Sequence, residues 1–316
     1  MKGAARTLLS AIITILIASF IIFGAMHAAP GDPVTVLIGN PENITPERIA
    51  EVEAQYHLDQ PFFVQYWYWL SGVFTGDLGT SYLYHQPVAM LIASRVPTSL
   101  TLVAISTVLL AIIGIGLGVA SAMKRGRAID SVVVGGTTLL ASVPSFVAGI
   151  GFVAVFSVWL GWFPVAGAGT GFLSTLHHLF LPALAMAIGA VAIVSRVTRQ
   201  SMIEQFGLDH VEAARAYGLG EASVVTGHVL RNSWGPILTM VSLIVASMIA
   251  GTVAVETVFG LSGIGSLLVD SINSHDFPVV QATLLIMVIA YMVVTTLVDL
   301  LHPLIDPRVT TGRTVA

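Results

Sequence analysis

Two residue types that supply common chemistry are absent or rare in this sequence. It contains no cysteine, and its 316 residues include only two lysines, Lys2 and Lys124. Without cysteine there are no disulfides, no thiolate metal ligands and no cysteine nucleophile. A P-loop reads G-x-x-x-x-G-K-[ST], and the nearest approach, Gly118 to Lys124, lacks the second glycine and the Ser or Thr. The chain therefore does not hold ATP on a P-loop.

Charged residues are scarce as well. They make up 9% of the sequence, whereas 55% of it is hydrophobic, and soluble domains carry about 25% charged residues. So few charges do not cover a water-facing surface, which excludes an ordinary soluble globular protein. The composition predicts an all-α fold, a polytopic bundle of membrane-spanning helices.

Long apolar runs place the spans. A helix needs about 20 mostly apolar residues to cross a hydrocarbon layer of roughly 30 Å. The 65 residues between Asp130 and Arg196 contain no Asp, Glu, Lys or Arg, which is enough for two spans. Six transmembrane helices are predicted, at 8–29, 100–123, 131–157, 179–195, 232–255 and 277–298. The first run could be read as a signal peptide, but it exceeds the 7–15 residues of a signal core, so we expect 1–29 to remain as an anchor.

The basic residues predict the orientation. Cytosolic loops of membrane proteins carry an excess of Lys and Arg. With both termini cytosolic, only Arg48 and Arg95 fall outside. The remaining eleven fall inside: Lys2, Arg6, Lys124, Arg125, Arg127, Arg196, Arg199, Arg215, Arg231, Arg308 and Arg313.

The connections predict four parts: the anchor 1–29, an extracytoplasmic segment 30–98, a core 99–305 with five spans, and a cytosolic tail 306–316. The outer segment has a helix signature from Thr45 to His57, followed by an aromatic cluster at 62–69. That cluster suits an interfacial helix, with a small packed outer cap as the alternative. The cytosolic loop, about 196–234, predicts helices at 198–216 and 221–231, broken at 218–220, and 256–276 reads as a glycine-rich outer loop.

The predicted spans lack the groups that couple transport to protons or ions. None carries an acidic or basic residue away from its ends, and such residues are the usual sign of coupling. Glu256 and Asp299 lie at span borders, where we expect them to reach water. His177 and His178 are adjacent, so on a helix they do not face each other as metal ligands would. A passive pore, or a pathway driven by another protein, remains.

The longest cytosolic loop carries a motif. Glu212-Ala213-Ala214 is followed by Gly218, and nine residues later by His228-Val229-Leu230-Arg231. This resembles the EAA loop, E-A-A-x3-G-x9-I-x-L-P, of permease subunits in binding-protein-dependent ABC importers, although His228 and Arg231 depart from it. The physical reading is a helix kept slim by alanine, a glycine turn that ends it, and a carboxylate with flanking arginines that fix register on a partner. The alternative is an ordinary linker helix.

The resemblance extends over nearly the whole chain, to dipeptide/oligopeptide permeases of the B-subunit type. It is carried by Pro30-Gly31-Asp32-Pro33, Leu58-Asp59-Gln60-Pro61 with Gln65-Tyr66, Gly76-Asp77-Leu78-Gly79-Thr80-Ser81, Arg95-Val96-Pro97-Thr98-Ser99-Leu100, Val255-Glu256-Thr257-Val258-Phe259-Gly260 with Gly263-Ile264-Gly265, Asp276-Phe277-Pro278-Val279-Val280-Gln281, and the stretch from Asp299 to Arg308. Ser262 stands where the family commonly has proline. The large segment between the first two spans distinguishes the B-type subunit from its partner.

The resemblance implies a permease of the bacterial cytoplasmic membrane that is not itself an enzyme. Its implied partners are a second homologous permease, two P-loop ATPases that bind ATP and Mg²⁺, an extracytoplasmic binding protein, a peptide substrate and the lipid bilayer, with no nucleic acid. No cofactor or metal is expected in this chain. The coupling residues would be Glu212, Ala213, Ala214, Arg215, Tyr217 and Gly218.

The translocation path is expected on the fifth span, at Ser242, Ser247, Met248, Thr252 and Glu256, with helix–helix packing through small residues as the alternative. Two questions stay open. The first is the substrate, because nickel and glutathione importers use permeases of the same type. The second is the class of protein, because a channel or scaffold subunit without ATPase partners is the alternative to an importer permease.

Overall fold

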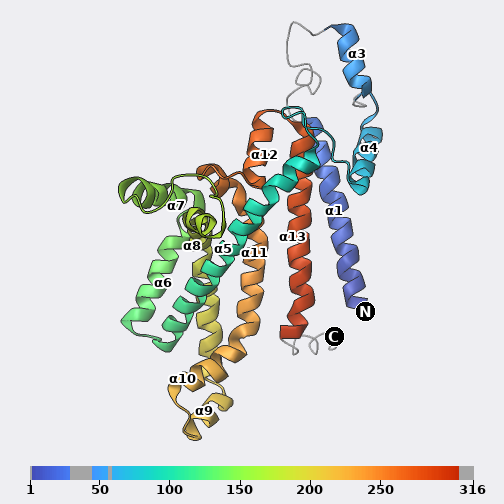
Figure 1. The fold of residues 1–316 in the computed structure, drawn as a ribbon. Coiled ribbons are helices and arrows are strands. Elements are labelled where there is room, and N and C mark those ends of the chain that lie inside the picture. Colours follow the sequence, from blue (N-terminus) through green and yellow to red (C-terminus); the bar gives the residue numbers. More distant parts are fainter. Residues whose placement is uncertain (1, 29–44, 56–58, 306–316) are drawn as a thin grey trace. The chain divides into compact units, whose positions relative to one another are not determined.

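The computed structural model describes residues 2–28, 45–55 and 59–305. This part of the chain is helical, apart from loops and one isolated β-bridge between Thr80 and Pro87 (Figure 1). Its elements are α1 (Lys2–Ala28), α3 (Pro46–Gln55), α4 (Phe62–Thr75), α5 (Val88–Met123), α6 (Ala128–Ala141), α7 (Ser145–Phe152), the π-helical η2 (Val153–Trp159), α8 (Phe172–Phe206), α9 (Asp209–Ala216), α10 (Glu221–Ser223), the π-helical η3 (Val224–Leu230), α11 (Arg231–Val258), α12 (Ile264–Asn273) and α13 (Phe277–Ile305). The predicted motif 30–33 and the tail 306–316 lie outside the described residues.

Within the residues that the structure describes, five helical segments are long and apolar enough to cross a membrane. They are Leu8–Ala28, Val88–Met123, Phe172–Phe206, Glu221–Val258 and Phe277–Leu297. Each contains or nearly coincides with one of the predicted spans, so the all-helical membrane bundle is confirmed. The two helices predicted in the outer segment are also present, as α3 and α4.

The third predicted span, 131–157, is not one straight helix. It divides into α6 and the pair α7–η2, which meet at a bend of 98°. Pro144 precedes α7 with φ −57° and ψ 143°. Proline lacks the N–H that would continue α6, and it disfavours helical geometry at Val143 before it. The described part of the chain has six candidate spans only if this bent pair counts as one.

Helix α5 begins earlier than predicted, at Val88, and Pro97 lies inside it. The predicted boundary at 98/99 therefore falls within a helix. The predicted loop 256–276 likewise contains the helix α12. Contacts group the chain into two compact units, 1–99 with 262–290 and 100–261 with 291–316. The four-part division of the sequence remains a prediction.

The first unit contains an aromatic interface between α1 and α4. Phe23 packs on Phe62 and Tyr66 with ring centroids 5.3 and 5.5 Å apart. Ser19 and the Tyr66 hydroxyl are hydrogen-bonded at 2.9 Å, and His27 Nε2 lies 3.0 Å from Gln65 Oε1. These contacts fix α4 to the carboxyl-terminal half of the first span.

The same unit has a buried carboxylate at the start of α13. Asp276 accepts hydrogen bonds from the Ser81 hydroxyl and from the backbone N–H groups of Tyr82 and Leu83, the latter two at 3.1 and 3.2 Å. Its side chain is fully buried. The carboxylate therefore ties the 80–87 loop to the α12–α13 turn.

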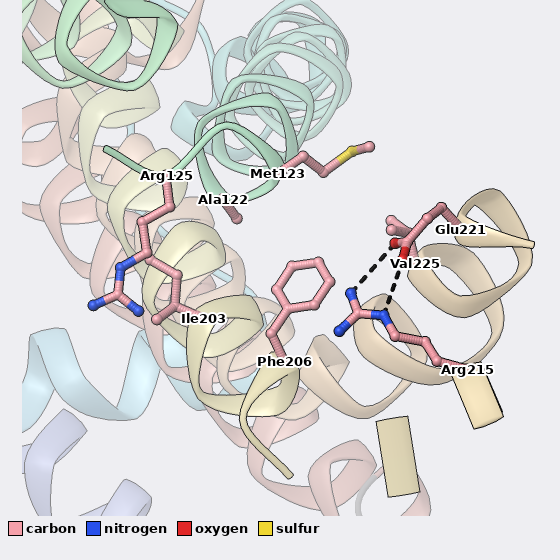
Figure 2. A pocket seen from close by; sticks show the side chains of 8 residues that line it. All are labelled: Ala122, Met123, Arg125, Ile203, Phe206, Arg215, Glu221 and Val225. Atoms are coloured by element: carbon pink, nitrogen blue, oxygen red, sulfur yellow. Dashed lines mark hydrogen bonds and ion pairs between the residues drawn. The ribbon is translucent and has the colours of Figure 1, made fainter. Parts of the chain in front are cut away.

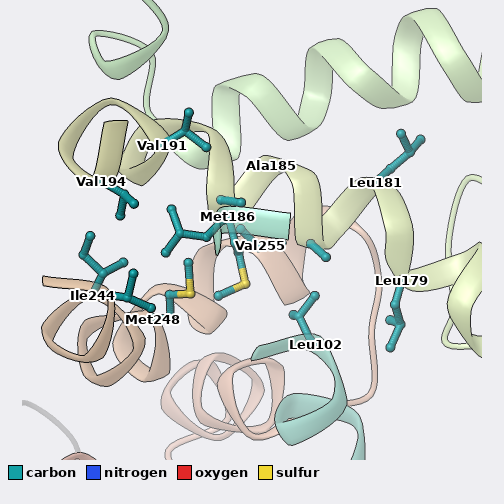
Figure 3. Packing of buried hydrophobic residues seen from close by; sticks show 14 of the residues in the cluster. Leu102, Leu179, Leu181, Ala185, Met186, Val191, Val194, Ile244, Met248 and Val255 are labelled. Atoms are coloured by element: carbon teal, nitrogen blue, oxygen red, sulfur yellow. The ribbon is translucent and has the colours of Figure 1, made fainter. Parts of the chain in front are cut away.

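The second unit holds the largest apolar core, built around α8 and α11 with α5. Figure 3 shows Met186 of α8 and Met248 of α11 among the packed side chains, with Leu102 of α5 beside them. Two glycines let α5 approach α8 closely. A Cβ at Gly118 would lie 2.5 Å from the Cβ of Thr198, and one at Gly114 would lie 2.9 Å from that of Val194. This small-residue packing is typical of helices in membranes.

Candidate functional site: the cytosolic coupling loop

The loop after the fourth span is built differently from the prediction. The predicted helix 198–216 is interrupted, because α8 ends at Phe206 and α9 begins at Asp209 after a turn at 207–208. The predicted helix 221–231 is present, but it continues beyond residue 231. Residues Glu221–Val258 run on as one helical segment through η3 into the span. Arg231 stands where the resembled motif has proline, and without proline nothing removes the backbone hydrogen bonds there.

Helix α9 ends in a Schellman motif. The Gly218 N–H donates to the Arg215 carbonyl at 2.9 Å, and the Leu219 N–H donates to the Ala214 carbonyl at 3.2 Å. Gly218 has φ +81°, in the left-handed region that glycine adopts without steric cost. The glycine of the motif thus closes the helix sharply, as predicted.

Helix α9 has two distinct faces. Val211 and Ala214 are buried, and they pack with Ala122 of α5, Met202 of α8 and Val224 of η3. This cluster is the seat of α9, and we use that name for it below. Ala214 therefore packs against this chain and does not lie on the exposed face of α9, and its role in coupling stays a prediction.

The opposite face of α9 is exposed. Asp209, Glu212, Ala213 and Ala216 follow a spacing of three and four residues, which puts them on one stripe of the helix. The stripe combines two carboxylates with two methyl groups. Of the two alanines predicted to keep the EAA helix slim, Ala213 lies on this stripe, and Ala216 adds a second methyl group beside it.

The turn after α9 projects apolar side chains. Tyr217 is 87% exposed and Leu219 is 42% exposed. Leu208, at the other end of α9, is 47% exposed. Apolar side chains grouped at both ends of a short helix, with carboxylates between them, form a surface suited to a protein partner.

The predicted coupling residue Arg215 is paired within the chain. Its Nε lies 2.9 Å from Glu221 Oε1, and its guanidinium lies 5.8 Å from the centre of the Phe206 ring. Figure 2 shows this pair beside a hollow of about 270 Å³ lined by Ala122, Met123, Arg125, Ile203, Phe206, Arg215, Glu221 and Val225. Both charged groups are largely exposed, so the pair adds little stability, but it braces α9 against α10.

The predicted path residues divide by burial. Met248, Thr252 and Glu256 are buried within the chain, Met248 in the main core. Ser247 is exposed and Ser242 is half-buried. The expectation that Glu256 reaches water at the span border is wrong, because its exposure is 0%.

The adjacent histidines His177 and His178, in the first turns of α8, have separate partners. His177 Nε2 lies 2.9 Å from the Trp162 carbonyl, whereas His178 Nδ1 lies 2.9 Å from the Ser174 carbonyl. Among residues 2–28, 45–55 and 59–305 there is no group of three His, Asp or Glu side chains that could hold a metal ion.

One polar cluster near the loop was not predicted. The Asp130 carboxylate at the start of α6 accepts two hydrogen bonds from Arg199 of α8, at 2.7 and 2.8 Å. It also accepts from the Ser121 hydroxyl of α5 and from the Gly126 N–H at 2.9 Å. Asp130 and Arg199 are 69 residues apart in the sequence, and the only sequence signal was a lone carboxylate in a basic turn.

The described residues form apolar membrane-spanning helices, with the short helix α9 exposed between two of them, and this is the arrangement of a membrane transport subunit. The chain belongs to the family described as binding-protein-dependent transport system inner membrane component, whose model matches residues 114–311. A second model, for the amino-terminal part of such membrane components, matches residues 1–103. The chain is therefore a multi-pass permease component of an ABC importer in the inner membrane.

Named relatives match along the full length. The chain is 36% identical over 307 residues to the glutathione transport system permease protein GsiC of Salmonella choleraesuis (strain SC-B67), covering 96% of this chain and 97% of that one. It is 38% identical over 303 residues to a putative peptide transport system permease protein of Brucella abortus (strain 2308), covering 95% and 96%.

Solved structures support the fold. An inward-facing conformation of the MetNI methionine ABC transporter matches with a TM-score of 0.58 at 16% identity, covering 69% of this chain and 97% of that chain. A structure of an amino acid ABC transporter with histidines matches with a TM-score of 0.52 at 16% identity, covering 67% and 92%. The helical arrangement is thus that of an ABC importer permease.

Proposed function

We propose that this chain is the permease subunit of an ATP-driven importer for dipeptides or oligopeptides, and that α9 with its flanking turns is the element driven by the ATPases. The observation that carries the proposal is the division of α9 into two faces. The inner face, with Ala214, is seated on the bundle. The outer face presents Glu212 and Ala213, and Tyr217 projects beyond it.

This arrangement suits transmission of force. The inner face of α9 is packed against the ends of α5 and α8 and against η3. A partner that binds the outer face and moves α9 would therefore also move these helices. Closure of two ATPase subunits would then move two permease subunits as bodies and switch the path between its inward- and outward-facing states. By reciprocity, a docked binding protein would favour ATPase closure.

The partners follow from this mechanism. We propose a second homologous permease, two P-loop ATPases that bind ATP and Mg²⁺, and an extracytoplasmic binding protein. The two carboxylates on the outer face, Asp209 and Glu212, fit a groove with basic side chains.

The proposed contact with the ATPase is tested by removing the exposed side chain of Tyr217, which follows α9. Burying a tyrosine contributes about 1.5–3 kcal/mol, so Tyr217→Ser should lower the affinity for the ATPase by roughly 10- to 100-fold. The assay is recovery of the ATPases with tagged permease from membranes. Tyr68→Ser is the matched control, because Tyr68 is 51% exposed on α4, in the predicted outer segment.

Unchanged ATPase recovery with Tyr217→Ser would contradict the proposal and favour the channel or scaffold class. Loss with both variants would indicate general damage to the complex. Loss with Tyr217→Ser alone supports the coupling role.

Peptide is the preferred substrate class because a relative of this chain is described as a peptide permease. Glutathione, itself a tripeptide, is the second candidate, since another relative is described as a glutathione permease. Nickel remains the third from the family resemblance. ATP-dependent uptake of labelled dialanine, glutathione and Ni²⁺ by vesicles containing the complete importer separates the three.

A further inference from the structure

The cluster around Asp130 joins three helices near the coupling loop. Four hydrogen bonds reach one carboxylate, from Ser121 in the last turn of α5, from Gly126 in the α5–α6 turn, and twice from Arg199 of α8. The Asp130 side chain is 8% exposed and that of Arg199 is 25% exposed. The pair is thus largely withdrawn from water, in contrast to the exposed pair between Arg215 and Glu221.

A buried ion pair is a poor device for stability alone. The cost of removing two charges from water offsets much of their attraction, and well-packed apolar residues often serve equally well. The bidentate fork between arginine and a carboxylate differs in its geometry, because two parallel hydrogen bonds allow one relative orientation. Apolar side chains would permit α8 to rotate or slide against α5 and α6.

The cluster lies next to the seat of α9. Ala122, which follows Ser121, belongs to that seat, and so does Met202, one turn after Arg199. On the other side of the seat are Val211 and Ala214 of α9. The ion pair therefore fixes the two helix ends against which α9 packs.

We infer that Asp130 and Arg199 are a positioning pair for transport coupling: they hold the ends of α5 and α8 in the one register that seats α9. A displacement of α9 then moves α5, α6 and α8 together instead of being lost by slippage between them. This inference rests on the proposed role of α9 as the driven element. Neither side chain contacts substrate or ATP in this account.

The test uses the complete importer in lipid vesicles and measures how many-fold the binding protein stimulates ATP hydrolysis. The main variant is the double change Asp130→Leu with Arg199→Met, which keeps the packing volume and removes the fork. We expect the ATPases still to co-purify and the stimulation to fall at least fivefold. Arg196→Lys is the control, because Arg196 is exposed one turn earlier on α8, and it should keep full stimulation.

Arg199→Lys provides a second, milder variant. It keeps the charge but cannot form the fork, so we expect an intermediate loss of stimulation without a change in the thermal midpoint of the complex. A purely structural pair would instead lower the midpoint and the yield and leave the stimulation per assembled complex unchanged. Full stimulation in Arg199→Lys overturns the inference, even if the double variant does not fold.

The outcome for Tyr217→Ser separates this inference from the proposed function. If that variant retains the ATPases, the proposed function itself fails. If it loses them while Arg199→Lys and the double variant keep full stimulation, the proposed function stands and only the positioning role of the pair is wrong.

Discussion

The close approach of α5 to α8 at Gly118 predicts a measurable clash. Gly118→Ala places a Cβ 2.5 Å from Thr198 Cβ and 2.7 Å from the Ser195 carbonyl oxygen. Carbon atoms pack at about 3.5–4.0 Å, so the two helices must separate by roughly 1 Å. Overpacking of this kind costs about 1–3 kcal/mol. The clash lies one turn from Ser121, so we expect it also to loosen the Asp130 cluster.

Gly116→Ala is the matched control on the same helix. A Cβ at Gly116 meets nothing within 4 Å. Both variants gain the same helix propensity of about 1 kcal/mol, so this gain cancels in the comparison. We expect Gly118→Ala to be about 1–3 kcal/mol less stable than Gly116→Ala.

The assay is unfolding of the purified permease in mixed micelles, with increasing denaturing detergent and helical circular dichroism as the signal. Equal stability of the two variants would show that α5 and α8 are not packed through Gly118. A higher stability for Gly118→Ala would contradict the packing outright.

Three further predictions concern the loops and the first unit. Gly218→Ala, at φ +81°, should cost about 1 kcal/mol of unfolding free energy, whereas Gly227→Ala, with open space around it, should not. Asp276→Ala leaves a hydroxyl and two N–H groups unpaired and should cost about 3 kcal/mol, visible as faster hydrogen exchange in the 80–87 loop. Ala214→Leu should lower the thermal midpoint by overpacking the seat of α9, whereas Ala213→Leu, on the exposed face, should leave it unchanged while weakening ATPase recovery. Equal midpoints for these last two variants would contradict the assignment of the faces.

Hydropathy was sufficient to predict most of the membrane helices, because about 20 apolar residues without charge have few other stable arrangements. It did not predict the break at Pro144, although proline is a visible signal. The uncharged stretch around it masked the turn. The start of α5 at Val88 was missed because the predicted span followed only the uncharged run from Leu100, and Arg95 and Pro97 lie before that run.

The loop around α9 shows what a motif predicts and what depends on tertiary packing. The glycine turn at Gly218 follows from local backbone preference, and it was predicted. Which of Ala213 and Ala214 faces outward depends on how α9 sits on α5 and α8, and a local motif does not contain that information. The pairing of Asp130 with Arg199 is likewise a long-range contact, and the burial of Glu256 depends on helices packed around it.

The central claim is that this chain has no energy source of its own, and that partner ATPases move it by binding the outer face of α9. The most direct measurement is uptake of labelled substrate into vesicles that contain the complete importer, with ATP supplied on the cytosolic side, for wild type and for Ala213→Trp. We expect ATP-dependent accumulation by the wild type, none by Ala213→Trp, and none by the permease alone. Accumulation against a gradient by the permease alone, or wild-type uptake by Ala213→Trp, would contradict it.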